Sequence, residues 1–230
     1  MKIVVIAPHP DDEVLGCGGT ITRLSSEGHS VYVLIVTKGT EPMFPAEGTL
    51  QSRKDAIEAH NMLGVQETVF FDKFPAALLD TIPHSELNKA IRMEIERLTP
   101  DVLFVPFPGD IHIDHRIVFE SSLVSCRPNG GFIPRIIFAY ETLSETNWNA
   151  PFITPRFEPN TFIDIYKYLE IKVNAFLSYS SEVRLFPNER SVEAIRALAK
   201  HRGATVNYHA AEAFVMIRSV YPHDCKLFDV

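Results

Sequence analysis

The segment from Pro8 to Glu13 brings several ionisable side chains close together. His9 lies between two prolines and is followed by Asp11, Asp12 and Glu13. Imidazoles and carboxylates are metal ligands, and a carboxylate that stays off the metal can act as a general base. Acidic residues alone could serve to complement a helix dipole, but that role requires neither the histidine nor the prolines. The segment therefore predicts a metal or acid–base site.

A second segment carries matching chemistry. His112 and His115 are three positions apart, with Asp114 between them and Asp110 shortly before them. A carboxylate next to a ligating imidazole commonly fixes the tautomer of that imidazole. On its own this stretch is also compatible with a surface turn, so its interpretation depends on whether the fold brings it to the first segment.

The ligand types indicate which metal to expect. Two imidazoles and one carboxylate, with one position left for water, match a catalytic zinc site. Iron(II) and cobalt(II) share this preference and are the alternatives. Magnesium would favour carboxylates and phosphates over histidines. We therefore expect one zinc ion per chain.

Apolar runs that alternate with helical stretches are expected to position these segments. Strands that are apolar on both faces and separated by helices predict an α/β fold, a doubly wound, Rossmann-like sheet that is mostly parallel. In the expected strand order 3-2-1-4-5, strands one and four are neighbours, so the two histidine segments that follow them face one crevice. The predicted strands are Lys2–Ala7, Val31–Val36, Thr68–Phe71, Val102–Val105 and Ile136–Tyr140, and the predicted helices are Gly19–Glu27, Ser52–Leu63, Ser85–Leu98 and His115–Val124.

Residues 1–140 are expected to form the α/β core, and the remaining residues, 141–230, are expected to form a loop and a C-terminal extension of it. We expect a long surface loop over Glu141–Pro159, because this stretch is rich in Thr, Asn and Pro. Further predicted elements are a strand over Phe162–Ile165, helices over Lys167–Tyr179 and Ser191–Arg202, and a strand over Ala213–Ile217. The simplest organisation is one domain over residues 1–230.

Composition excludes several classes of protein. The chain has 230 residues, 46% apolar and 22% charged, and its net charge is −7 without a basic run, which argues against nucleic acid or an anionic membrane as partner. Its three cysteines, Cys17, Cys126 and Cys225, form no zinc-finger spacing and are typical of a reducing compartment. We expect a cytoplasmic protein. A homo-oligomer is compatible with the apolar C-terminal part.

The sequence resembles the LmbE-like, or PIG-L-type, family of zinc-dependent N-acetylglucosaminyl deacetylases. Such proteins carry a strand followed by (A/P)HPDDE and, later in the chain, HxDH, and both motifs are intact here at residues 8–13 and 112–115. The resemblance covers most of the chain. Arg53 and the segment Ala211–Phe214 also occupy places where the family carries an arginine and an AEAF-like segment.

The resemblance implies a role for each matching residue. His9, Asp12 and His115 would bind zinc, and Asp11 would be the general base that deprotonates the attacking water. His112, held by Asp114, would support the oxyanion of the tetrahedral intermediate. Arg53 would bind the sugar through its forked donors, although a solvated arginine on a helix face is the alternative.

Several positions stay without an assigned role. Where the family often carries an aspartate after a Phe-Pro pair, this chain has Ala76, and Asp72 or Asp80 are the candidates to replace it. His209 and Glu212 are also open. Glu13 is expected to cap the following helix or to support a ligand, and Asp110 to be a more distant polar residue of the site or a turn former. The glycines at 16, 18 and 19 do not form a dinucleotide-binding GxGxxG motif.

These observations predict a zinc-dependent hydrolase that removes the acetyl group from an N-acetylated amino sugar or sugar conjugate, releasing acetate and a free amine. A metal-dependent phosphoesterase is one alternative, because paired aspartates at strand ends also hold magnesium. A non-catalytic sugar-binding module on the same fold is the other. Specificity is expected to lie in the loops Thr40–Leu50 and Glu141–Pro159.

Overall fold

The computed structural model describes residues 1–129, 131–221 and 223. These residues form one seven-stranded sheet with the order β3-β2-β1-β4-β5-β7-β6. Strands β1 to β5 are parallel, whereas β7 runs antiparallel to β5 and β6 antiparallel to β7. The strands are β1 Lys2–Ala7, β2 Ser30–Ile35, β3 Glu67–Phe70, β4 Val102–Pro106, β5 Ile136–Tyr140, β6 Thr161–Asp164 and β7 Ala211–Ser219.

The predicted α/β class and the order 3-2-1-4-5 are confirmed, with one addition. The C-terminal segment contributes β7 and β6 to the edge of the sheet beside β5, so this part of the chain extends the sheet. The predicted loop over 141–159 contains only a short 3-10 turn, Thr146–Trp148.

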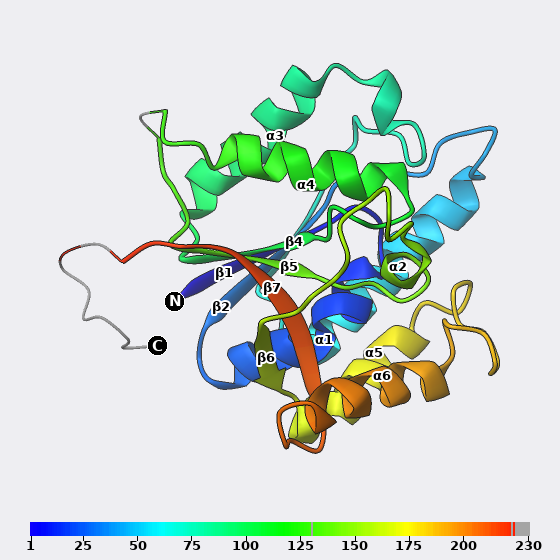
Figure 1. Ribbon diagram of the computed structural model, residues 1–230. Helices are drawn as coiled ribbons and strands as arrows, with labels where there is room; N and C mark the ends of the chain where they lie inside the picture. The colour runs from blue at the N-terminus through cyan, green and yellow to red at the C-terminus, as the bar shows by residue number, and fades with distance from the viewer. Residues whose placement is uncertain (130, 222, 224–230) are drawn as a thin grey trace.

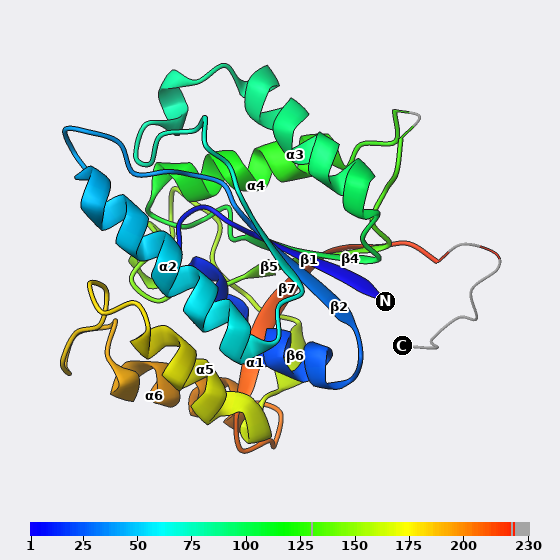
Figure 2. The ribbon, with the colours of Figure 1, turned by 180° about the vertical axis from the view of Figure 1, so that it is seen from behind.

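Helices cover both faces of the sheet (Figures 1 and 2). On one face lie α3 and α4, and on the other lie α1, α2, α5 and α6. In β1, Ile3 and Val5 belong to the core under the second group, whereas Val4 and Ile6 belong to the core under α3 and α4. The helices are α1 Asp12–Ser26, α2 Ala46–Leu63, α3 His84–Leu98, α4 Ile113–Ser125, α5 Leu169–Leu177 and α6 Val192–Ala204, with short 3-10 turns at Leu79–Thr81 and Tyr166–Tyr168.

Two helices begin earlier than the sequence pattern predicts. Helix α1 begins at Asp12 instead of Gly19, so three glycines with low helix propensity lie inside it. Packing explains them: a Cβ on Gly19 would lie 2.7 Å from Cβ of Ile165, and one on Gly16 would overlap the ring of Tyr140. Helix α2 begins at Ala46 instead of Ser52. The early start of α1 places Asp12 in its first turn, at the end of β1.

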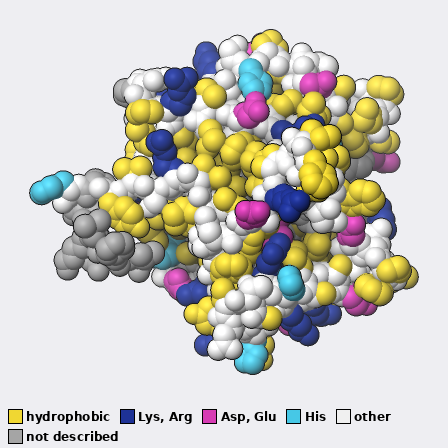
Figure 3. Space-filling view, in the orientation of Figure 1, with side chains coloured by type: hydrophobic (Ala, Val, Ile, Leu, Met, Phe, Trp, Pro, Cys, Tyr) yellow, Lys and Arg dark blue, Asp and Glu magenta, His cyan; other side chains and the backbone are white. Residues whose placement is uncertain are grey.

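Charged side chains are dispersed over the face in Figure 3, where Lys and Arg lie in several separate places among acidic and apolar groups. None of the helices in the described residues has the length and hydropathy needed to cross a bilayer. Cys17 and Cys126 are buried free thiols, as expected for small core residues. Cys225 lies outside the described residues.

Replacing Gly19 with alanine tests the packing of α1. We expect Gly19→Ala to lower the free energy of unfolding by about 1–3 kcal/mol, because Ile165 or the helix must move. Gly48→Ala in α2 is the matched control, since a Cβ there meets nothing within 4 Å and alanine favours the helix. Urea unfolding of both variants gives the comparison. Equal stability of the Gly19 variant and the wild type would contradict the close approach.

Candidate active site

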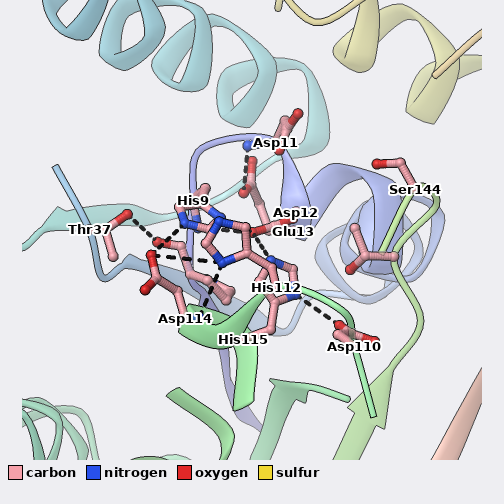
Figure 4. Close-up of polar contacts among 12 residues, drawn as sticks. His9, Asp11, Asp12, Glu13, Thr37, Asp110, His112, Asp114, His115 and Ser144 are labelled. Carbon is pink, nitrogen blue, oxygen red and sulfur yellow. Dashed lines mark hydrogen bonds and ion pairs between the residues drawn. The ribbon is translucent and has the colours of Figure 1, made fainter. Parts of the chain in front are cut away.

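The two histidine segments meet at the carboxyl ends of β1 and β4. These strands are hydrogen-bonded neighbours, with Val5 opposite Phe104. The loop before α1 and the loop before α4 therefore lie side by side, and the rings of His9, His112 and His115 gather around Asp12 and Asp114 (Figure 4). The convergence expected from the strand order is present in the structure.

His9, Asp12 and His115 have the geometry of a metal-binding group, with one ligand atom from each lying within 4.8 Å of the others. Oδ2 of Asp12 is 3.4 Å from Nδ1 of His9 and 3.2 Å from Nε2 of His115. Ligand atoms about 2.1 Å from a tetrahedral metal are about 3.4 Å apart, so these separations fit a common ion. Nε2 of His115 is buried without a hydrogen-bond partner among the described residues, as expected for an atom that faces a metal.

Asp110 orients His115 from the side opposite the metal-binding atom. Its Oδ2 lies 2.8 Å from Nδ1 of His115, and its Oδ1 accepts a hydrogen bond of 2.6 Å from Oγ1 of Thr146. A carboxylate here favours the tautomer with the proton on Nδ1 and the lone pair on Nε2. Sequence reasoning left Asp110 without a specific role. The position of Asp110 just before the HxDH segment is the sequence signal that could have indicated this orienting role.

Asp114 contacts His9 more closely than it contacts the imidazole of His112. Its Oδ2 is 3.0 Å from Nε2 of His9 but 4.0 Å from Nδ1 of His112. The backbone N–H of Asp114 instead donates a hydrogen bond of 3.1 Å to Nδ1 of His112. Asp114 thus contacts His112 through its backbone N–H, whereas its carboxylate orients His9.

His9, His112 and Asp114 form a second group with metal-binding geometry. Oδ2 of Asp114, however, already accepts a 2.7 Å hydrogen bond from the backbone N–H of Ala77, and its Oδ1 accepts one of 3.3 Å from that of Leu79. The group with Asp12 and His115 fits an ion better, because it contains the buried nitrogen without a partner.

Asp11 projects beside this cluster without joining it. It precedes α1 with φ of 108°, a left-handed conformation that turns its side chain away from that of Asp12. Its Oδ2 accepts a 2.7 Å hydrogen bond from Nη1 of Arg190, which also contacts Glu182 at 2.7 Å. Burial raises the pKa of Asp11 well above its usual range, and the charge of Arg190 opposes this effect. The carboxylate of Asp12 therefore faces the imidazoles, whereas that of Asp11 faces Arg190.

Glu13 supports Asp11 from inside the protein. It is fully buried, and its Oε2 accepts a hydrogen bond of 3.2 Å from the backbone N–H of Asp11. Its Oε1 lies 3.0 Å from Nε2 of His60 and 2.6 Å from the hydroxyl of Tyr179, which donates to it. Glu13 thus supports the loop, as expected. His60, Tyr179 and Arg190 were not found by sequence reasoning.

A cavity of about 370 Å³ opens over these groups. His9, Asp11 and His112 line it, together with Glu145, Tyr179 and Arg190. Residues of the segments 40–50 and 141–159, in which specificity is expected to lie, both contribute to the lining. The other lining residues are Pro10, Thr37, Lys38, Gly39, Phe44, Pro45, Gly48, Thr49, Ser52, Arg53, Ala76, Ala77, Ser181 and Glu182.

The structure also gives the positions of Arg53 and of the residues to which the sequence assigned no role. Arg53 lines the cavity, and its Nη2 lies 2.9 Å from Oδ1 of Asp72. Asp80 and His209 are exposed and are not among the lining residues. Glu212 is buried, pairs with Lys172 at 2.6 Å and accepts hydrogen bonds from the backbone N–H groups at the middle of α1. Glu212 therefore stabilises the packing of α1 rather than the cavity.

The imidazoles differ in their electrostatics. Burial lowers the pKa of His9, but hydrogen bonds to Asp114 and Asp12 outweigh it and raise this pKa to about 9. Burial and the neighbouring charge of His9 lower the pKa of His112 to about 4. His112 is therefore neutral at pH 7. With Nδ1 accepting from the backbone, its proton is on Nε2.

Asp110→Asn tests the orienting carboxylate. We expect the affinity for zinc to fall about 10- to 100-fold, because His115 loses the group that fixes its tautomer. Competition with a chromophoric chelator measures the affinity. Glu120→Gln, at an exposed position of the same helix α4, is the matched control and is expected to bind zinc as the wild type does. Unchanged affinity in the Asp110 variant would show that Asp110 does not orient a ligand.

The raised pKa of His9 predicts a pH-dependent affinity for metal. Below about pH 9 the metal-free site holds a proton on His9 that the ion must displace, so affinity should rise with pH. Asp12 and Asp110 also hold the pKa of His115 well above its usual value against the effect of burial, so the ion displaces at least one proton and the increase is at least about tenfold per pH unit. Calorimetric titration with zinc between pH 6 and 8 measures it. An affinity that is constant over this range would contradict the proposed ligation by His9.

Known proteins resemble this chain over most of its length. The uncharacterized deacetylase YaiS of Escherichia coli is 29% identical, over 78% of this chain and 90% of that protein. The diacetylchitobiose deacetylase of Thermococcus kodakarensis is 27% identical, over 100% of this chain and 88% of that protein. Both relatives are named as deacetylases, and the chain covers nearly all of each.

A solved structure shows that the fold alone does not determine the reaction. GalB, the 4-carboxy-2-hydroxymuconate hydratase of Pseudomonas putida, superimposes with a TM-score of 0.75 over 98% of both chains. Its identity to this chain is 17%, so the likeness concerns the fold. The family is shown by the sequence itself: residues 4–124 match the family described as PIG-L, GlcNAc-PI de-N-acetylase. This match spans more than half of the chain and contains both histidine motifs, and the protein therefore belongs to the PIG-L family.

Proposed function

We propose that this protein is a zinc-dependent deacetylase that hydrolyses the N-acetyl group of an amino sugar or sugar conjugate to acetate and a free amine. One observation carries the proposal: a carboxylate that is free of the metal-binding group, that of Asp11, lies beside this group in one cavity. Metal-dependent amide hydrolysis uses both an ion that polarises the carbonyl and a base that activates water.

His9, Asp12 and His115 are the proposed metal ligands. A zinc ion held by them would supply a Lewis acid for the amide carbonyl and lower the pKa of the attacking water towards about 7. Asp11 takes the proton of this water and later delivers it to the departing amine. Its burial favours a proton on the carboxyl group, whereas Arg190 favours the carboxylate, so Asp11 can both accept and release a proton.

His112 is the proposed donor to the oxyanion. Its neutral imidazole carries the proton on Nε2, because Nδ1 accepts from the backbone N–H of Asp114. His112 lines the cavity together with His9 and Asp11, so a carbonyl bound between them would develop its negative charge near this N–H. Asp114 positions His9 through its carboxylate and His112 through its backbone.

An N-acetylated sugar is the substrate class that the relatives support. The named activity of the Thermococcus protein concerns diacetylchitobiose. The cavity of about 370 Å³ lies at the lower end of the range of small-molecule sites, roughly 300–1,000 Å³, and suits one or two sugar rings. Arg53 on the cavity wall can bind hydroxyl or anionic substituents with its forked donors.

The two alternative functions have less support. A magnesium-dependent phosphoesterase would use carboxylates and phosphate oxygens as ligands, whereas two of the three candidate ligands here are imidazoles. A non-catalytic sugar-binding module would have no use for Asp11, whose buried carboxylate accepts from Arg190 and whose backbone N–H donates to Glu13. Oligomeric state and a cytoplasmic location stay predictions.

Asp11→Asn tests the proposed base. We expect turnover to fall at least about 100-fold while zinc stays bound, because Asn cannot accept the proton and Asp11 is not a ligand. Acetate release from a panel of N-acetyl sugars and metal content are the two measurements. Asp80→Asn, an exposed carboxylate outside the cavity, is the control. An Asp11 variant with full metal content and wild-type turnover would exclude Asp11 as the base.

His112→Ala separates the two possible metal groups. If His9, Asp12 and His115 hold the ion, this variant keeps its zinc and loses about 100- to 1,000-fold in turnover, as when an oxyanion donor is removed. If the ion instead binds His9, His112 and Asp114, the variant loses zinc. His115→Ala is the reciprocal variant and is expected to lose the metal. Zinc loss in the His112 variant alone would overturn the proposed ligand set.

A further inference from the structure

One wall of the cavity carries two cations that share a single carboxylate. Lys38 and Arg53 both line the cavity. Nζ of Lys38 is 3.4 Å and Nη2 of Arg53 is 2.9 Å from the same atom, Oδ1 of Asp72. The two positive groups therefore lie close together, and one carboxylate offsets only one of them.

Among the described residues, the acidic side chains that line the cavity form no ion pair with Lys38 or Arg53. Two of them, Asp11 and Glu182, are paired with Arg190 at 2.7 Å. Asp72 itself is a weak competitor, because its side chain is 63% exposed and ion pairs at such positions contribute little. Glu145 is the remaining acidic residue of the lining, and among the described residues it pairs with neither Lys38 nor Arg53.

The fold brings both cations to this wall. The backbone N–H of Lys38 donates a 2.8 Å hydrogen bond to the carbonyl oxygen of Phe74, which fixes the backbone at this position. The guanidinium of Arg53 lies over the ring of Phe70, 4.8 Å from its centroid. Nη2 of Arg53 is buried, and its 2.9 Å contact with Oδ1 of Asp72 lacks hydrogen-bond geometry, so an anion that displaces Asp72 would gain a hydrogen bond there.

This wall lies one strand away from the metal ligands. Thr37, which precedes Lys38, donates hydrogen bonds of 3.0 Å from its N–H and 2.8 Å from its hydroxyl to the carbonyl oxygen of Pro8, the neighbour of His9. Adjacent strands are about 4.8 Å apart. A sugar whose acetamide group reaches His9 would therefore place another of its substituents near Lys38 and Arg53.

We infer that Lys38 and Arg53 form an anion subsite that selects an N-acetylated sugar bearing a phosphate or a carboxylate. The inference rests on the proposed function, since it names the substrate class of the same cavity. On binding, the anion displaces Asp72 from the two cations. Ala76 and Ala77, which also line the cavity, bring no carboxylate that would repel it.

The test compares charged and neutral substrates of otherwise similar structure. N-acetylglucosamine, its 1- and 6-phosphates and N-acetylmuramic acid are assayed for released amine. We expect kcat/KM to be about fivefold to tenfold higher for at least one anionic sugar than for N-acetylglucosamine, and this preference to fall as salt is added. Comparison of the two sugar phosphates with N-acetylmuramic acid, which carries a carboxylate, identifies which anion is preferred. No preference for any anionic sugar would overturn the inference.

Three variants test whether Lys38 and Arg53 cause the preference. Lys38→Met should reduce the ratio of anionic to neutral kcat/KM about fivefold. Asp72→Asn should raise the same ratio about twofold to fivefold, because the competing carboxylate is removed. Lys54→Met removes a charge from an exposed neighbour of Arg53 that does not line the cavity, and it should leave the ratio unchanged. An equal loss in the Lys38 and Lys54 variants would indicate a general field effect and contradict a subsite.

A binding measurement separates this inference from the proposed function. Calorimetric titration of the wild type and of Lys38→Met with glucosamine 6-phosphate requires no turnover. Weaker binding to the variant supports the subsite even if no N-acetyl sugar is hydrolysed, in which case the proposed function fails alone. The opposite result is also distinguishable. If neutral and anionic sugars are hydrolysed at equal rates, and the wild type and Lys38→Met bind glucosamine 6-phosphate equally well, the proposed function holds and the anion subsite is contradicted.

Discussion

The carboxylate of Asp12, held between two imidazoles, is the interaction on which the rest of the site depends. It is 1% exposed, and its Oδ2 also accepts a 2.9 Å hydrogen bond from the backbone N–H of His9. Burial would raise the pKa of Asp12, but the charges of His115 and His9 hold this pKa well below its usual range. A buried carboxylate must be paired in this way, because an isolated one would cost several kcal/mol. The fold supplies the pairing by placing β1 beside β4.

Much of the surrounding structure serves to balance buried negative charge. Asp11, Glu13, Asp110 and Asp114 are buried with Asp12 around one crevice, although the whole chain has a net charge of only −7. Each has a defined partner. Asp11 has Arg190, Glu13 has His60 and Tyr179, Asp110 has His115, and Asp114 has His9. A bound divalent cation would complete this balance at the point where Asp12 faces two nitrogens.

The sequence predicted the sheet and the convergence of the two motifs because both depend on simple rules. Runs that are apolar on both faces form central parallel strands, and strand order brings the loops after β1 and β4 together. Boundaries set by tertiary packing were beyond these rules. Gly16 lies outside the predicted helix because glycine has low helix propensity, and its close approach to Tyr140 explains why a glycine occupies this position of α1. Strands β6 and β7 were predicted from the sequence and are present, but their antiparallel place beside β5 depends on packing at the sheet edge.

The polar partners of the site were the least predictable part. Arg190 and Tyr179 come from the C-terminal segment, far in sequence from Asp11 and Glu13, and no local pattern marks them. Lys38 follows an ordinary buried strand, and its significance emerges only from the wall that it shares with Arg53. Long-range contacts of this kind decide which base is free and which charge the cavity presents. Motif spacing carries no information about them.

The central claim is that His9, Asp12 and His115 hold a zinc ion beside the free carboxylate of Asp11. Anomalous diffraction from crystals of the zinc-loaded protein, recorded on both sides of the zinc absorption edge, tests it most directly. The account predicts one strong peak per chain about 2.0–2.2 Å from Nδ1 of His9, Oδ2 of Asp12 and Nε2 of His115. A peak bounded by His112 and Asp114 instead, or no peak at all in this cavity, would contradict it.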